Sequence, residues 1–147
     1  MYGSVASADI YFSYRMKHEV WDDAATANKT RALETATTHI DRLNFLGSKT
    51  EDTQTNEFPR DISDDETPEV IEYATYEIAY ALLEGRDPEM ELETLGLESA
   101  SLNPAKVVFN KNSVPLHLAN GIVSAMAWSY LKPYLRSPSN MRVYRVN

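Results

Sequence analysis

The fold is decided by residues 67–85, TPEVIEYATYEIAYALLEG, which carry the clearest helix pattern in the chain. Thr67 is placed to cap this helix, Pro68 takes its first position and Gly85 ends it. Two adjacent apolar rows run along it: Ile71, Ala74, Ile78 and Leu82 in one, and Tyr73, Tyr76, Tyr80 and Leu83 in the other. So wide an apolar face predicts burial on two sides, between helices or at a contact between subunits.

Two helices are predicted before this one. Ser7 is a plausible cap for a short amphipathic helix with Ile10, Tyr11 and Tyr14 on its apolar side, followed by Trp21 as a core anchor. The segment 26–45 predicts a longer helix, since Leu33, Ala36, Ile40 and Leu43 form one stripe, and Gly47 is placed to end it.

A long polar loop and a last helix complete the predicted body. The acidic segment 48–66 has no apolar periodicity, and Phe58 with Pro59 would attach it to the core. A last helix is predicted from about residue 115 to 131, with these residues facing inward: Leu118, Ile122, Ala125, Met126 and Ser129 or Tyr130.

The segment 86–115 is predicted to be an exposed arm, acidic at first and then rich in serine and asparagine. Its Val107, Val108 and Phe109 give the one convincing strand signal in the sequence. We therefore predict a mainly α domain over residues 1–135, a small bundle of about four helices with a protruding β segment in this arm. An extended C-terminal tail, residues 136–147, follows.

Charge divides the chain into two unequal parts. Residues 1–98 hold all 22 acidic residues and 8 of the 14 basic ones, a net charge of −14, whereas residues 99–147 hold 6 basic residues and no acid. This segregation indicates that the two parts meet different surroundings, or each other across copies. The chain has no cysteine, no start typical of a signal peptide and no apolar run long enough for a membrane span, so a soluble intracellular protein is expected.

The sequence predicts no enzyme, no cofactor and no metal site. His18, His39 and His117 share no ligand spacing, and the acidic stretch DISDDE, residues 61–66, lacks the central glycine and closing glutamate of a calcium loop. The five glycines stand apart, so no phosphate-binding loop is present, and no serine lies in a nucleophile motif. Catalytic residues are therefore predicted to be absent.

The tyrosines of segment 67–85 could stack on nucleic-acid bases, as aromatic side chains do in single-strand binders. The same segment also carries four glutamates: Glu69, Glu72, Glu77 and Glu84. A backbone of phosphates is attracted by cations and repelled by carboxylates, so packing in the core or between subunits is favoured for these tyrosines. The basic C-terminal tail has the charge that suits nucleic acid or an acidic protein cleft.

Several stretches in a fixed order resemble the phage head–tail adaptor, or connector, family, some of whose members carry the description DnaT-like single-stranded-DNA-binding protein. The stretches are YGSVASADIYFSYR, the tryptophan at 21 followed by ALETATTHIDRLNFLG, then FPRD, TPEVIEYATYEIAYALL and LKPYL. The similarity covers most of residues 2–135, and the segment AKVVF departs from the family's usual pattern.

This resemblance implies a helical subunit repeated as a ring of about twelve copies beneath the portal of a DNA-filled capsid. The implied partners are further copies, the portal protein, tail or other neck proteins, and DNA that passes through without sequence-specific binding. The implied location is the virion neck, with host cytoplasm during assembly. The alternative is a DnaT-like module that binds single-stranded nucleic acid. A helical domain with a solubilising basic end is the third possibility.

Two candidate surfaces follow. Neighbouring copies are expected to touch through the following residues: Tyr73, Tyr76, Tyr80, Val107, Val108 and Phe109. The tail is expected to dock on a portal, or to grip phosphates in the alternative, through the following residues: Arg136, Met141, Arg142, Val143, Tyr144, Arg145 and Val146. Arginine would pair with acidic groups, and the apolar side chains would supply buried area.

Overall fold

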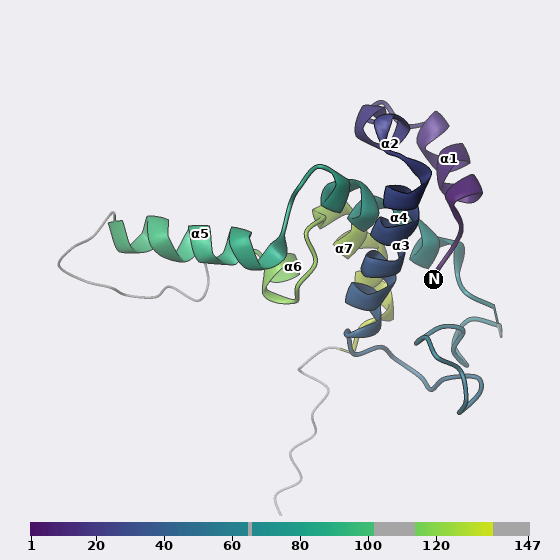
Figure 1. Ribbon diagram of the computed structural model, residues 1–147. Helices are drawn as coiled ribbons and strands as arrows, with labels where there is room; N and C mark the ends of the chain where they lie inside the picture. The colour runs from purple at the N-terminus through teal and green to yellow at the C-terminus, as the bar shows by residue number, and fades with distance from the viewer. Residues whose placement is uncertain (65, 102–113, 137–147) are drawn as a thin grey trace, which may run out of the picture.

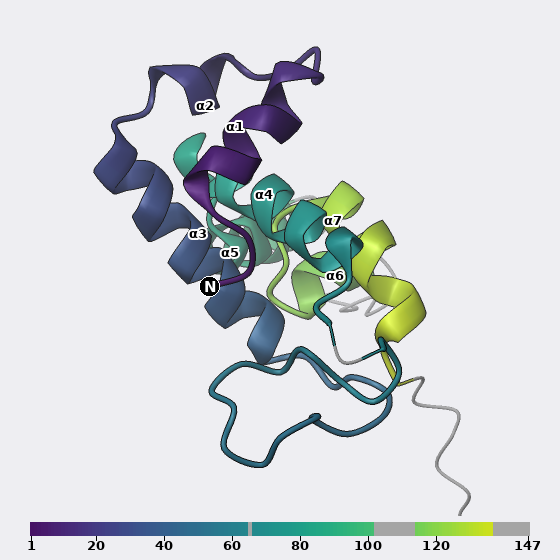
Figure 2. The same cartoon turned by 90° about the vertical axis from the view of Figure 1, so that its right-hand side faces the viewer.

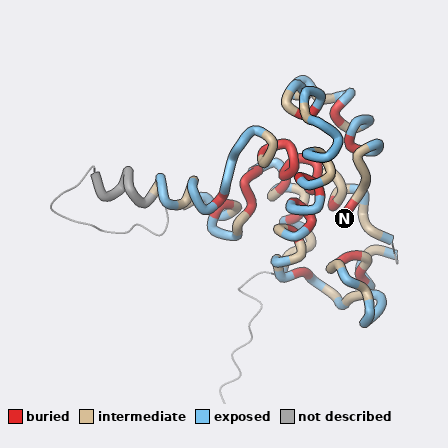
Figure 3. The backbone as a smooth tube through the Cα atoms, in the orientation of Figure 1, coloured by how far each residue is buried: buried red, intermediate tan, exposed pale blue. Residues whose placement is uncertain are grey.

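The computed structural model of the chain describes residues 1–64, 66–101 and 114–136. Its centre is α4 (Glu69–Leu83), which lies between α3 (Thr26–Asp41) on one side and α7 (Ala125–Leu131) on the other (Figures 1 and 2). Nine residues of α4 are buried, which confirms the burial on two sides: Ile71, Ala74, Thr75, Tyr76, Glu77, Ile78, Ala79, Tyr80 and Ala81. Figure 3 shows this buried strip in the middle of the body.

The two ends of α4 follow the chemistry of its sequence. Pro68, rather than Thr67, occupies the cap position, and Glu69 and Glu72 lie in the first turn, where the helix dipole favours negative charge. At the other end Gly85 has a φ of +82°, a conformation that glycine adopts without a steric cost. Its N–H donates to Leu82 and the N–H of Arg86 donates to Ala81, the two hydrogen bonds of a Schellman motif.

The N-terminal part differs in phase from the prediction. α1 (Val5–Ser13) is capped by Ser4, whose hydroxyl accepts from the N–H of Ser7. Its buried residues are Ala8 and Phe12, while the predicted apolar positions Ile10 and Tyr14 are exposed. The cap lies three residues earlier than expected, and the small Ala8 lets the helix lie close to its neighbours.

Trp21 is confirmed as a core anchor, although it lies in a short helix, α2 (Glu19–Asp23), that the sequence did not predict. Its ring stacks on Phe12 at a centroid distance of 4.9 Å. Its indole N–H donates to the carboxylate of Asp9 over 2.7 Å, which satisfies the one polar atom of a fully buried side chain.

α3 ends at Asp41, six residues before Gly47, so the prediction that it runs to Phe45 is wrong. Its predicted stripe is confirmed where the helix is present, because Leu33, Ala36 and Ile40 are buried. Beyond the helix, Phe45 turns into the core and forms an isolated antiparallel bridge with Leu135. Burial of this aromatic side chain outside helical geometry explains the early end.

The loop between α3 and α4 is attached to the body by Phe58, as predicted. Its ring is 3% exposed and packs edge-on against Phe45 at 4.8 Å and Tyr134 at 5.9 Å. Arg60 provides a second attachment that the sequence did not indicate. Its buried guanidinium donates to the carbonyls of Leu46 and Gly47, each over 2.7 Å, and forms an ion pair with Glu57.

The predicted arm begins as a helix, α5 (Pro88–Ser101), which projects from the body (Figure 1). The sequence did not indicate this helix, because its Ser-rich end and its acidic residues show no clear apolar stripe. The expected β segment at residues 107–109 lies outside the described residues. Within the described ranges there is no strand, only the two isolated bridges between Phe45 and Leu135 and between Lys49 and Arg60.

The last predicted helix is two helices, α6 (Leu116–Ala119) and α7, separated by a turn over the non-helical residues 120–124, in which Gly121 has a φ of +75°. The turn restarts the helical phase, so the inward residues after it differ from the prediction. Leu118 and Ile122 are buried as expected, whereas Ala125, Met126 and Ser129 are exposed and Tyr130 is half-buried. Ala127 and Leu131 take the buried positions. A short 3₁₀ helix, η1 (Lys132–Tyr134), continues α7.

Candidate nucleic-acid interface

Most basic side chains of the first 98 residues are neutralised by carboxylates of the same chain. Six of the eight form ion pairs within 3.2 Å: Arg15 with Glu77, Lys17 with Glu84, Lys29 with Asp9, Lys49 and Arg60 with Glu57, and Arg86 with Glu91. Four basic residues form no ion pair with a described carboxylate, namely Arg31 and Arg42 on one side and Lys132 and Arg136 near the end of the described chain. These four are available to an outside anion.

Lys132 and Arg136 border a hollow of about 270 Å³, which we call the Trp128 cleft. It lies between the end of α3, α6 and the α7–η1 segment. Its lining is Leu43, Asn44, Leu116, Asn120, Trp128, Lys132, Leu135 and Arg136. This set contains a tryptophan, two cations and two side-chain amides, and no carboxylate.

The spacing of the sequence builds this cleft. Trp128 and Lys132 are four residues apart on a continuous helical segment, which places them on the same face. Ser124 starts that segment by accepting from the N–H of Ala127. Arg136 follows four residues after Lys132, and its guanidinium donates to the carbonyls of Phe45 (2.8 Å) and Gly47 (3.2 Å). These hydrogen bonds hold the Arg136 side chain at the segment after α3, in the cleft that Trp128 also lines.

This arrangement has the parts that a single-stranded nucleic acid needs. A half-buried indole offers a face for base stacking, which is worth about 1–3 kcal/mol per base in single-strand binders. Lys132 and Arg136 are exposed and can neutralise phosphates. The amides of Asn44 and Asn120 can donate to and accept from base edges. All five groups lie in one cleft that carries no negative charge of its own.

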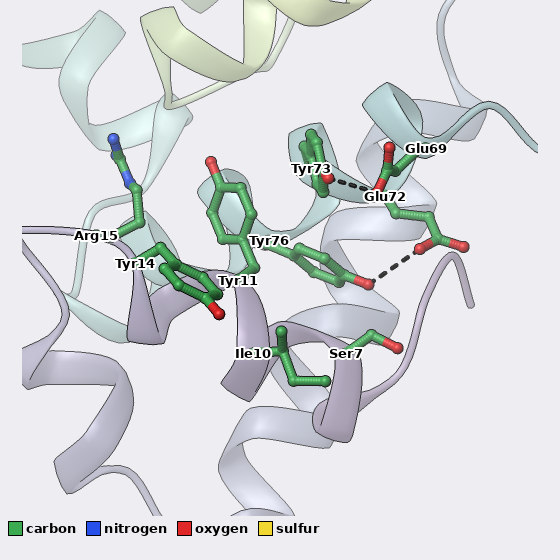
Figure 4. A pocket seen from close by; sticks show the side chains of 9 residues that line it. All are labelled: Ser7, Ile10, Tyr11, Tyr14, Arg15, Glu69, Glu72, Tyr73 and Tyr76. Atoms are coloured by element: carbon green, nitrogen blue, oxygen red, sulfur yellow. Dashed lines mark hydrogen bonds between the residues drawn. The ribbon is translucent and has the colours of Figure 1, made fainter.

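A second hollow, of about 460 Å³, opens between α1 and α4, and we call it the tyrosine groove (Figure 4). Its lining is Ser7, Ile10, Tyr11, Tyr14, Arg15, Glu69, Glu72, Tyr73 and Tyr76. The hydroxyl of Tyr73 donates to Glu69, and that of Tyr76 donates to Glu72 over 3.2 Å. Figure 4 shows both carboxylates on one side of the groove, at the first turn of α4.

The tyrosine groove is electrostatically unsuited to phosphate. Its one cation, Arg15, lies 2.7 Å from the carboxylate of Glu77, which also accepts from Tyr11 over 2.6 Å. Glu69 and Glu72 form no ion pair with a described cation, so they leave the groove negative. Burial, together with the negative charge of Glu72, raises the pKa of Tyr76 to about 12, so this phenol stays protonated at neutral pH.

The sequence model of the family described as "Putative DnaT-like ssDNA binding protein" matches residues 1–146. The chain belongs to this family. No curated protein and no solved structure matches the chain. The DnaT-like part of the resemblance is thereby supported, and the head–tail adaptor part receives no support. The match covers both hollows as well as the basic residues beyond Arg136.

Within this DnaT-like chain, the structure places the tyrosines predicted for a subunit contact mostly inside the body. Tyr76 is 1% exposed and Tyr80 is 5% exposed, so both fill the chain's own core. Tyr73 keeps part of its surface in the tyrosine groove. Val107, Val108 and Phe109 lie outside the described residues. A contact between subunits through these residues stays a prediction.

Of the predicted tail residues, Arg136 is described and lines the Trp128 cleft. The other six lie outside the described residues: Met141, Arg142, Val143, Tyr144, Arg145 and Val146. Trp128 and Lys132 were not predicted as site residues. The sequence feature that could have identified them is the regular spacing of four residues from Trp128 to Lys132 and from Lys132 to Arg136, in a part of the chain without acidic residues.

The three histidines have different surroundings and share no partner. His18 pairs with Asp22 at 2.7 Å, and His117 donates from Nδ1 to the carbonyl of Ile122. His39 is half-buried, and burial together with the charge of Arg42 lowers its pKa. No group of three or more metal-binding side chains occurs in the described ranges, and no helix there is long and apolar enough to cross a membrane.

Proposed function

We propose that the protein binds single-stranded DNA without catalysing a reaction, and that the Trp128 cleft is its first contact. The observation that carries this proposal is the pair of cations, Lys132 and Arg136, that flank a half-buried indole and form no ion pair with a described carboxylate. The family description supports the same ligand. No metal or cofactor is needed, since stacking and charge neutralisation supply the binding energy.

The charge distribution determines where the strand runs. The acidic body repels phosphates, and the six basic residues after position 98 attract them. A strand therefore lies along the C-terminal side, with a base on Trp128 and neighbouring phosphates on Lys132 and Arg136. Residues 137–147 extend this path with Arg142 and Arg145. Stacking and phosphate contacts read no base edge, and the amides of Asn44 and Asn120 can both donate and accept, so binding is expected to show little sequence preference.

Tryptophan fluorescence tests this proposal directly. The chain has two tryptophans, and Trp21 is fully buried against Phe12, so quenching by an added oligothymidylate reports on Trp128. We expect saturable quenching at low salt. Trp128→Ala, followed by fluorescence anisotropy of labelled DNA, should lose about 1–3 kcal/mol of binding free energy. The circular dichroism spectrum of the variant serves to check that it is folded.

A charge-matched pair of variants separates a site from a general charge effect. Lys132→Gln removes one cation of the cleft, and Arg31→Gln removes one exposed cation of α3 that is in no ion pair with a described carboxylate. We expect Lys132→Gln to weaken binding and to reduce the salt slope of the binding constant by about 0.7. Arg31→Gln should change neither. Equal effects of the two variants, or no quenching at all, would refute the proposed site.

The second candidate function is an assembling subunit, such as the head–tail adaptor that the sequence resembles, in a phage neck with portal and tail proteins as partners. The observation that favours it is the helix α5, which projects from the body (Figure 1), together with exposed apolar side chains on and after α1: Ile10, Tyr14 and Met16. Native mass spectrometry decides between the two. A ring gives a high multiple of 16.6 kDa, and a simple DNA-binding module does not.

A further inference from the structure

The tyrosine groove is an open surface of a particular chemistry. Ile10 is 64% exposed and Tyr14 is 87% exposed, so two large apolar side chains of α1 face solvent. Glu69 and Glu72, in the first turn of α4, line the same groove and form no ion pair with a described cation (Figure 4). A surface with apolar contacts and two carboxylates selects a partner that is apolar and carries two positive charges.

Residues 137–147 of the same chain have this chemistry. Their sequence, SPSNMRVYRVN, holds two arginines and no acid. It also holds four apolar side chains, at Met141, Val143, Tyr144 and Val146. The two arginines carry a charge of +2, which balances the charge of −2 on Glu69 and Glu72. Arginine is suited to such a contact because its planar guanidinium can bind a carboxylate through two N–H groups at once.

Two residues shortly before the end of the described part, Tyr130 and Tyr134, lie close to residues of the groove. The ring of Tyr130 in α7 lies 6.2 Å from that of Tyr73, a residue of the groove. Tyr134 lines a hollow together with Glu69, and Arg136 follows two residues later. The eleven residues after Arg136 span up to about 36 Å when extended. The length of the segment therefore allows it to reach the groove of its own chain.

We propose that residues 137–147 dock in the tyrosine groove of the same chain. Arg142 and Arg145 pair with Glu69 and Glu72, and the apolar side chains cover Ile10 and Tyr14. This docking does not depend on the proposed DNA binding. One consequence does rest on that function: the arginines that would contact phosphates are held by the groove when DNA is absent, so the groove competes with DNA for the segment.

The absence of cysteine allows a clean test by disulfide trapping in the full-length chain. In the variant Ile10→Cys with Tyr144→Cys, mild oxidation at micromolar protein should join the two positions within one chain. A faster-moving monomer band in a non-reducing gel would record this bond. The matched control is Thr35→Cys with Tyr144→Cys, since Thr35 is exposed on α3 in a different hollow. The control should not cross-link.

Neutralising the groove tests the charge pairing. Glu69→Gln with Glu72→Gln, added to the first cysteine pair, should slow cross-linking about fivefold, the effect expected for the loss of two exposed ion pairs. Equal cross-linking in the control pair, or disulfide-linked dimers in place of the intramolecular bond, would overturn the proposal. Dimers would indicate that a second copy, or a partner protein, is the occupant of the groove.

The same glutamine variant without cysteines tests the competition with DNA. If the segment is docked for 90% of the time, fivefold weaker docking raises its free fraction from about 0.1 to about 0.36, so the apparent affinity for an oligothymidylate should rise about three- to fourfold. Unchanged affinity would refute the competition. Cross-linking in a protein that shows no DNA binding would support the docking and would refute only the proposed function, so the two failures can be told apart.

Discussion

Replacing Arg60 by methionine should destabilise the protein more than any surface substitution. The guanidinium is buried in the loop between α3 and α4, where it donates to the carbonyls of Leu46 and Gly47 and pairs with Glu57 at 2.6 Å. It also lies 6.0 Å from the ring of Phe45, within cation–π range. Methionine preserves an apolar stem of similar length and removes every one of these donors.

The size of the effect follows from the hydrogen bonds that methionine cannot make. A hydrogen bond to a charged group contributes about 1.5–3 kcal/mol, and leaving a buried acceptor unpaired costs about 1–3 kcal/mol. Glu57 is partly exposed and regains solvation, so its share is small. The carbonyl of Leu46 loses its charged donor, whereas the carbonyl of Gly47 keeps the guanidinium of Arg136 at 3.2 Å, so the expected decrease in unfolding free energy is about 2 kcal/mol. For a domain of this size that lowers Tm by roughly 4–8 °C.

The assay is urea and thermal unfolding followed by circular dichroism, and two variants control it. Arg60→Lys keeps the charge but cannot reach both carbonyls with a planar fork, so it should lose about half as much. Arg31→Ala removes an exposed arginine and should stay within about 0.5 kcal/mol of the parent. A stability of Arg60→Met within that same margin would show that the loop does not depend on the guanidinium.

Three further outcomes are expected. Gly3→Ala should destabilise the protein by at least about 1–2 kcal/mol in urea unfolding, because Gly3 has a φ of +70° and an added Cβ would lie 2.1 Å from the hydroxyl of Tyr76; unchanged stability would contradict this geometry. Burial and Arg42 lower the pKa of His39 from its usual value near 6.5, so the unfolded chain takes up more protons and the free energy of unfolding should fall as the pH falls below about 6.5. His39→Gln should therefore flatten the pH dependence of the urea midpoint measured from pH 7.5 to 5.5. An unaltered pH profile would exclude His39 as the cause. Four basic residues are expected to contact phosphates: Lys132, Arg136, Arg142 and Arg145. The logarithm of the DNA-binding constant, titrated from 50 to 200 mM salt, should then fall with a slope near −3 against the logarithm of salt concentration, a loss of affinity of about 50-fold. A binding constant that does not change with salt would argue against phosphate contacts.

The central part of the fold could be predicted because its signals are local. In α4 the charged first turn, the two apolar rows and the final glycine agree with one another, and the structure differs by one residue at the cap. Burial of Trp21 and attachment of the loop by Phe58 were also predictable, because a large aromatic side chain within a polar stretch of sequence is stabilised most by burial in the core.

Other parts depend on contacts that a sequence does not reveal. The residues from Ala125 onward were assigned to the wrong helix face, because a non-helical segment between α6 and α7 restarts the period and no local propensity fixes its length. α3 ends early because Phe45 packs against Phe58, a contact between positions thirteen residues apart. Arg60 looked like any loop arginine, and its burial depends on carbonyls that only the folded loop brings together.

The sequence predicted the charge of the candidate site but not its position in the fold. The basic C-terminal end pointed to a ligand such as nucleic acid or an acidic protein, and Arg136 is at the cleft. Trp128 was not singled out, since an isolated tryptophan in a helix is most often a core residue. Its exposure follows from the restart of the helical phase, which places Ala127 and Leu131 inward instead.

The bridge between Phe45 and Leu135 determines how the protein would carry mechanical force. In its two backbone hydrogen bonds, the N–H of Leu46 donates to the carbonyl of Tyr134 (2.8 Å) and the N–H of Arg136 donates to the carbonyl of Asn44 (2.9 Å). These bonds join residues 134–136, at the end of the described part, to the segment after α3. Such bonds lie across the strand direction, so tension along the C-terminal segment loads both of them together in shear. A pull on this segment is thus shared by α7 and by the buried ring of Phe45, and α7 is not peeled away alone.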